Sequence, residues 1–164
     1  MKKGIIGTVI LLLAVSSLAF VDSTELSEET EVVVNSEVAE SELNEEIVGI
    51  EFFEGTWVEA LEKAEEENKM IFLDAYATWC GPCKRMSKNV FTDQEVGALF
   101  NKNYINFKMD MEKGVGPQMA RNLELHSYPT LYIMTSDGEP ITSQVGFSDV
   151  ASLLSLGESS LEGQ

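Results

Sequence analysis

The only two cysteines of this chain, Cys80 and Cys83, are separated by Gly81-Pro82. A thiolate is a nucleophile, so two thiols at this spacing can attack a disulfide and then close one of their own. A purely structural disulfide is the other interpretation. A bridge that closes so short a loop restrains little chain entropy and stabilises a fold poorly. The pair therefore favours thiol–disulfide exchange.

The flanking residues predict how the two thiols are held. The apolar run Met70–Ala77 is typical of a buried strand, and Lys84–Val90 is typical of the body of a helix. Cys80 then lies at the helix N-terminus, where unpaired N–H groups and the helix dipole favour a thiolate. Cys83 lies one turn further on and is expected to be less exposed. We expect Cys80 to attack and Cys83 to resolve the mixed disulfide. Pro82 is compatible with a first helical turn.

One carboxyl group interrupts the predicted strand. Asp74 shares a strand face with Phe72 and Tyr76 in an otherwise apolar run. Burial penalises the ionised form, so its pKa is expected to be raised. A carboxyl group that titrates near neutrality suits a proton acceptor for Cys83. The other interpretation places Asp74 at a solvated strand end.

The remaining elements are predicted from periodicity and capping patterns. The other strands are expected at residues 47–53, 104–110, 130–135 and 141–145. The other helices are expected from a Thr56 cap to about Asn68, from a Thr92 cap through Phe100, within residues 114–125, and from a Ser148 cap through Leu156. Strands that alternate with helices predict an α/β fold with a mixed sheet and helices on both faces.

The N-terminal third has a different composition. Residues 1–19 are expected to be a signal peptide, with Lys2 and Lys3 before an apolar run, and residues 4–21 would alternatively form a membrane anchor. Residues 20–46 are expected to be an acidic disordered tether. The folded domain is then expected at 47–157, followed by a tail at 158–164. In either case we expect the domain to lie outside the cytoplasm, in the periplasm or a similar compartment.

The formal net charge of −17 comes mostly from one segment, because residues 22–62 contain no Lys or Arg. Nucleic acid is therefore not an expected partner, since phosphate binding needs clustered cations. A working role for the acidic segment, the recruitment of a basic partner, stays open beside that of a spacer.

Asp74, the sequence Trp79-Cys80-Gly81-Pro82-Cys83 and the later Tyr128-Pro129-Thr130 together resemble the thioredoxin family. The stretch Phe91-Thr92-Asp93 is similar to exported thioredoxin-like members. The resemblance covers about residues 47–156 and implies the thioredoxin fold, a central mixed sheet with helices on both faces.

The resemblance also implies a substrate groove. Pro129 is expected to follow a cis bond and to pack beside the Cys80–Cys83 disulfide, with the Tyr128 backbone pairing with an extended substrate. Trp79, Gly81, Pro82, Thr130 and Gly146 are the other residues expected to support this site. Two departures from the family pattern are visible. Asn106 occupies the position of a family lysine, with Lys108 two residues further on, and Tyr128 is bulkier than the usual residue.

The expected function is that of a thiol–disulfide oxidoreductase acting on protein disulfides outside the cytoplasm, as a monomeric reductant without a cofactor. By resemblance its electron donor would be a membrane relay of the DsbD type. The alternatives are an oxidising or isomerising thioredoxin-like protein and a metallochaperone that uses the two cysteines as ligands. His126 is expected to be a solvent-facing or satisfied side chain, although a role in tuning Cys80 stays open. No metal site is expected.

Overall fold

The structure is a computed structural model and describes residues 49–162. In these residues a four-stranded sheet has the order β2-β1-β3-β4. β1 (Met70–Tyr76) pairs in parallel with β2 (Tyr104–Asp110) and antiparallel with β3 (Thr130–Met134). β4 (Pro140–Val145) forms the far edge as the hairpin partner of β3. The predicted mixed sheet is confirmed, with β1 in its interior.

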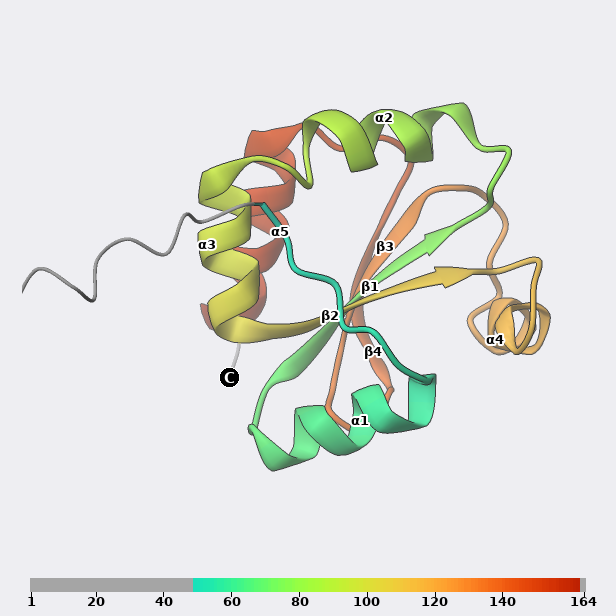
Figure 1. Cartoon of the computed structure of the whole chain (residues 1–164), viewed down its shortest axis with the longest axis horizontal. Coiled ribbons are helices and arrows are strands. Elements are labelled where there is room, and N and C mark those ends of the chain that lie inside the picture. The colour runs from blue at the N-terminus through green and yellow to red at the C-terminus, as the bar shows by residue number, and fades with distance from the viewer. Residues whose placement is uncertain (1–48, 163–164) are drawn as a thin grey trace, which may run out of the picture. The chain divides into compact units, whose positions relative to one another are not determined.

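Helices cover both faces of the sheet (Figure 1). One layer consists of α2 (Gly81–Asn89), α3 (Gln94–Asn103) and α5 (Val150–Glu162), and the other of α1 (Trp57–Glu66) and α4 (Gly116–Asn122). The side chains of β1 alternate between the layers, as a pleated strand requires. Phe72 packs in the core under α2, α3 and α5, while Ile71 and Leu73 pack in the core on the α1 side. Asp74 shares the face of Phe72, so it lies on the α2 side.

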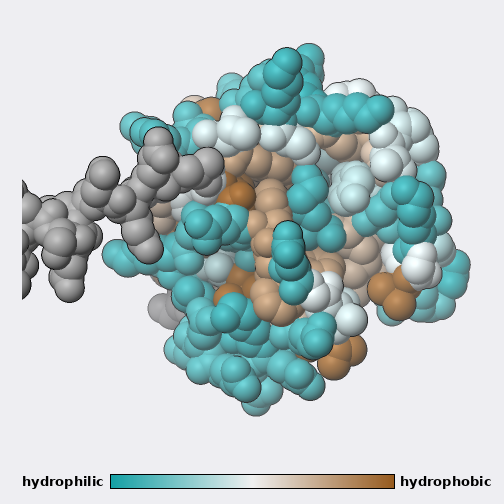
Figure 2. Space-filling view, in the orientation of Figure 1, coloured by the Kyte–Doolittle hydropathy of each residue, from teal (hydrophilic) through white to brown (hydrophobic). Residues whose placement is uncertain are grey.

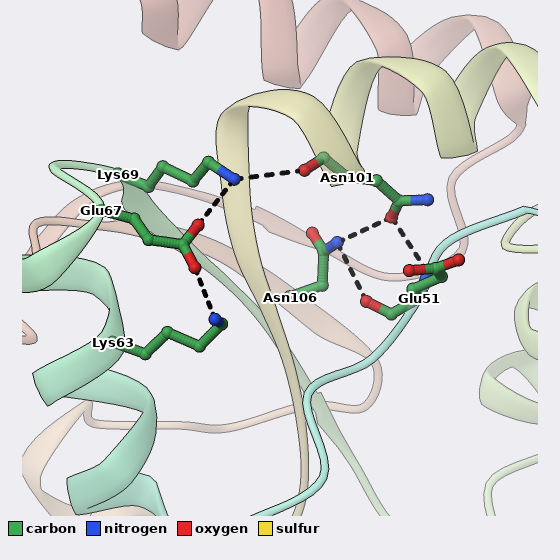
Figure 3. Close-up of polar contacts among 6 residues, drawn as sticks. All are labelled: Glu51, Lys63, Glu67, Lys69, Asn101 and Asn106. Atoms are coloured by element: carbon green, nitrogen blue, oxygen red, sulfur yellow. Dashed lines mark hydrogen bonds and ion pairs between the residues drawn. The ribbon is translucent and has the colours of Figure 1, made fainter. Parts of the chain in front are cut away.

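The strand expected at residues 47–53 is wrong for the described part. Residues 49–56 form no strand and run past β2 with one backbone bond to it, from the Phe53 N–H to the Asn106 carbonyl at 2.7 Å. Side chains hold the segment instead (Figure 3). The Asn101 carboxamide oxygen accepts from the Glu51 N–H at 2.9 Å and from the Asn106 side chain at 3.0 Å. The Asn106 side chain also donates to the Glu51 carbonyl. Two asparagines therefore replace a strand ladder.

The predicted helix caps have mixed outcomes. The Thr56 and Glu59 capping box is present, with Glu59 accepting from the Thr56 N–H at 2.7 Å. The Thr92 cap is wrong, because the Asp93 carboxylate accepts from the Glu95 and Val96 N–H groups and caps α3.

The Ser148 cap is also wrong. The Asp149 carboxylate accepts from the Ser152 N–H at 2.9 Å, while the buried Ser148 hydroxyl has no hydrogen-bond partner in the described part of the chain. In both helices, α3 and α5, the capping side chain is the aspartate one residue after the predicted Thr or Ser. A negative charge at that end also interacts favourably with the helix dipole.

The last helix is longer than expected. α5 continues from Val150 to Glu162 rather than ending near Leu156, so residues 158–162, expected as a tail, are helical. The expected signal or anchor at 1–21 and the acidic tether at 20–46 lie outside the described residues. Within residues 49–162, no helix is both long enough and apolar enough to cross a bilayer.

Candidate active site

The two cysteines lie where β1 gives way to α2. Cys80 is the N-cap of α2, with an extended backbone, and its sulfur accepts the Cys83 N–H at 3.1 Å. Pro82 falls in the first turn, where a missing N–H costs nothing. The two sulfurs form a disulfide of 2.09 Å with Cα atoms 5.3 Å apart. The helix start therefore directs a backbone donor at the sulfur that is expected to become the attacking thiolate.

The expected difference in exposure between the two cysteines is absent in this disulfide form. Cys80 is 2% exposed and Cys83 is 4% exposed. Both pack with Ala77 and with the half-buried rings of Tyr76 and Tyr128. The closed disulfide gives the two sulfurs similar shielding, so their assignment to attack and resolution still rests on position in the helix.

Trp79 is held away from the core by the loop after β2. Its side chain is 67% exposed, and its indole N–H donates to the Glu112 carboxylate at 2.8 Å. Its ring meets that of Tyr128 edge-on, with centroids 5.8 Å apart. The exposed indole and the half-buried phenol thus form a continuous aromatic surface beside the disulfide cluster.

A small polar network behind Trp79 was not anticipated. The Thr78 hydroxyl donates to the Asp110 carboxylate at 2.9 Å and accepts from the Lys113 ammonium at 3.0 Å. Lys113 and Asp110 also form an ion pair of 2.8 Å, which lowers the pKa of Asp110. The spacing of Asp110 and Lys113 after a strand was the available signal. That Asp110 and Lys113 would contact Thr78, which is distant in sequence, could not be predicted without the fold.

Asp74 is buried, at 1% exposure, as predicted. Burial raises the pKa of its carboxyl group, and the attraction of Lys108 offsets part of that rise. Lys108 lies directly opposite Asp74 in the parallel register of β1 and β2, and its ammonium is 3.0 Å from Oδ2. The geometry of this ion pair is not that of a hydrogen bond, and neither carboxylate oxygen has a hydrogen-bond partner in the described residues. Lys108 donates instead to the Ser87 hydroxyl of α2 at 2.8 Å.

The family lysine position and the lysine used here are therefore different residues. Asn106 anchors the segment before α1, and Lys108, two residues on, supplies the cation beside Asp74. Residues two apart on a strand share a face, so both positions reach the α2 side of the sheet.

Four of the predicted groove residues, Tyr128, Pro129, Thr130 and Gly146, lie together where β3 begins and β4 ends. The bond between Tyr128 and Pro129 is cis, as the resemblance implied. The Gly146 N–H donates to the Pro129 carbonyl at 2.8 Å, and the Thr130 hydroxyl donates to the Ser127 carbonyl at 2.9 Å. Gly146 has a φ of +91°, which favours glycine, and apart from its chain neighbours no described residue has an atom within 4 Å of a Cβ placed there. Gly81 has the same open space around it.

His126 is exposed. Across residues 49–162, no group of three or more His, Cys, Asp or Glu side chains is arranged to hold a metal ion.

A family model described as thioredoxin-like matches residues 53–136. The chain belongs to the thioredoxin-like family. It is 36% identical to thioredoxin of Mycobacterium tuberculosis over 87 residues, which are 53% of this chain and 70% of that protein. It is 33% identical to thioredoxin H4 of Arabidopsis thaliana over 90 residues, which are 55% of this chain and 71% of that protein.

Among solved structures, the chain is similar to a Bacteroides thetaiotaomicron protein provisionally named a disulphide-isomerase. The identity is 44% and the TM-score 0.64, and the match covers 71% of this chain and 97% of that one. A thioredoxin of Thermus thermophilus, 18% identical with a TM-score of 0.61 over 69% of this chain and 88% of that one, shows the fold alone. With its disulfide-forming cysteine pair, the chain is a thioredoxin-like disulfide oxidoreductase.

Proposed function

We propose that the chain is a protein-disulfide reductase that works outside the cytoplasm. The observation that carries the proposal is the Cys80–Cys83 disulfide at the N-terminus of α2, with a helix N–H directed at the Cys80 sulfur. Gly-Pro between the cysteines resembles reducing thioredoxins more than strongly oxidising members. Export is proposed from the basic and then apolar start of the sequence.

The reaction begins with the reduced protein. The Cys80 thiolate attacks one sulfur of a client disulfide, forms a mixed disulfide and displaces a client thiolate. Cys83 then loses its proton and attacks the Cys80 sulfur. The Cys80–Cys83 bond forms, the mixed disulfide breaks and the second client thiolate leaves. Two electrons have passed to the client, and the two client thiolates take up protons.

Asp74 is assigned the proton from Cys83. Its raised pKa makes it a better base than an ordinary carboxylate, and it lies on the face of β1 covered by α2. Lys108 contacts Asp74 and also lines a pocket with Cys83, so it connects the carboxylate to the thiol environment. A dithiol donor must restore the reduced state, and we propose a membrane relay of the DsbD type.

The direction of electron flow is tested by the reduction potential. The protein is equilibrated with glutathione buffers and its dithiol fraction is measured by alkylation. A potential near about −270 mV is expected for a reductant, whereas one near about −120 mV would contradict the proposed direction.

The proposed compartment is tested separately. The full chain is expressed with a C-terminal tag, and cells are fractionated with cytoplasmic and exported marker proteins. We expect the tag outside the cytoplasm. A tag recovered wholly with the cytoplasmic marker would overturn the compartment without affecting the measured potential.

A further inference from the structure

A basic pocket lies beside the second cysteine. It has a volume of about 400 Å³ and opens between the end of β1 and the exposed side of α2. Three lysines line it, Lys84, Lys88 and Lys108, together with Cys83. No carboxylate of residues 49–162 lines it. A pocket with this lining attracts anions.

Two of the three lysines have no intramolecular partner that accounts for them. Lys108 is committed to Asp74 and Ser87. Lys84 and Lys88 are exposed, and in residues 49–162 neither takes part in an ion pair. The lysines at 63, 69 and 113, by contrast, are each paired with a carboxylate. Two charges next to the site are therefore free for an external ligand.

Only one of these two charges suits the local helix, because Lys88 lies in the last turn of α2, where the helix dipole favours a cation. Lys84 and Lys88 are four residues apart on one face of α2, a spacing at which like charges repel by about 0.2–0.5 kcal/mol. Lys84 also lies near the N-terminus of the helix, where the dipole disfavours a cation. The remaining residues of α2 include no acid to compensate. Figure 2 shows hydrophilic side chains gathered over α2. Helix stability therefore accounts for Lys88 but not for Lys84, and a ligand with negative charge would suit both.

We propose that this basic pocket binds carboxylate side chains that flank the disulfide of a client protein, so that the enzyme prefers acidic disulfide segments. The inference rests on the proposed function and names its substrate class. A client held through Cys80 would place residues beside its cysteine within reach of the pocket, because Cys83 lines the pocket and its Cα lies 5.3 Å from that of Cys80. The chain has a formal charge of −17, so its net charge repels an acidic client. The lysines of the pocket would attract such a client locally.

The test uses the full chain, reduced beforehand and freed of reductant, in single-turnover reactions with three disulfide peptides of equal length. Their cysteines are flanked by Glu, by Gln or by Lys. At low salt the Glu peptide is expected to react about five-fold or more faster than the Gln peptide, and the Lys peptide more slowly. The ratio should approach one at about 1 M salt, where screening acts within about 3 Å.

Variants assign the effect to the pocket. Lys84→Gln with Lys88→Gln should bring the Glu-to-Gln ratio close to one, and Lys84→Glu with Lys88→Glu should reverse the preference toward the Lys peptide. Lys102→Gln is the matched control, because Lys102 is exposed and unpaired in the described residues but does not line the pocket. It should keep the original ratio. Ratios within one variant cancel any change in thiolate reactivity.

The possible outcomes distinguish a failure of the acidic-client preference from a failure of the proposed reductase function. Failure to reduce even the Gln peptide would overturn the proposed function. Reduction of all three peptides at equal rates would overturn the inference alone. A third outcome is that the full chain reduces the three peptides at equal rates, whereas a chain that lacks residues 22–46 reduces them at unequal rates. That result would assign the pocket to carboxylates of this chain and overturn a client segment as its occupant.

Discussion

Asp74 and Lys108 face each other across neighbouring strands and set the electrostatics beneath the active-site helix. Burial outweighs the attraction of the lysine, so the pKa of Asp74 is raised from its ordinary value of 3.8. The folded state then binds this proton more tightly than the unfolded chain does. Between 3.8 and the raised value, the free energy of unfolding therefore falls as the pH rises.

The substitution Asp74→Asn should remove this decline in unfolding free energy with rising pH. In urea titrations at several pH values, the variant is expected to lose less stability than the wild-type protein as the pH rises from about 4 to neutrality. An unchanged slope in Asp74→Asn would show that the carboxyl group titrates normally.

The same substitution tests catalysis. Loss of the proton acceptor should slow disulfide exchange by about 10- to 100-fold, mostly in resolution of the mixed disulfide. Stopped-flow reduction of a model disulfide peptide, with the mixed disulfide followed by mass spectrometry, separates the two steps. Equal rates in the variant and the wild type would remove Asp74 from the mechanism.

The roles of the two cysteines make a separate prediction. Cys83→Ser should accumulate mixed disulfides through Cys80, because attack still occurs and resolution does not. Mass spectrometry of reductant-sensitive adducts from an extract checks this result, with Cys80→Ser as the matched control that should trap far less. More adducts in the control than in Cys83→Ser would reverse the assigned roles.

At the scale of elements, the regular strands and helices around the site could be predicted because their apolar periodicity is strong. β2 has the predicted bounds, and the capping box of Thr56 is present. Capping by Asp93 and Asp149 was missed because a threonine or serine precedes each carboxylate. At each helix start the local sequence provides two possible caps, the hydroxyl and the carboxylate. The backbone geometry of the fold decides which of them caps the helix. The absence of a strand at residues 49–53 depends on Asn101 and Asn106, which are distant in sequence from that segment.

The corrected cap can be measured. Asp93→Ala should reduce the free energy of unfolding by about 1 kcal/mol, because two N–H groups at the start of α3 lose their acceptor. Thr92→Ala serves as the comparison, since its hydroxyl donates to the Lys88 carbonyl and caps no N–H group of α3 in the described part of the chain. Urea unfolding of both variants ranks the two positions. A larger loss for Thr92→Ala would restore the capping box predicted from the sequence.

At the scale of the whole molecule, the C-terminal helix closes the layer that contains the disulfide helix. The Tyr104 hydroxyl of β2 donates to the Gly157 carbonyl at 2.6 Å, and burial raises the pKa of Tyr104 to about 12. Ser160 is buried and Leu161 packs against the core. The sequence predicted a tail here because the apolar pattern weakens after Leu156.

Truncation tests how much those last turns contribute. A chain that stops after Gly157 should lose about 2 kcal/mol or more of unfolding free energy, through the loss of Leu161 burial and helix hydrogen bonds. A chain that stops after Glu162 should match the full length. Thermal unfolding of both compares them, and equal midpoints would make residues 158–162 dispensable.

The attachment of the chain at Gly49 has a mechanical consequence. A Cβ at Gly49 would lie 2.3 Å from the Phe91 carbonyl oxygen, and a Cβ at Gly97 would lie 2.2 Å from the Gly49 carbonyl oxygen. Glu51 is bonded to Asn101 just beyond. A pulling force applied through residues before 49 would therefore enter at the junction of α2 and α3. Cys80 lies at the opposite end of α2, so a force that enters at this junction is applied away from the disulfide.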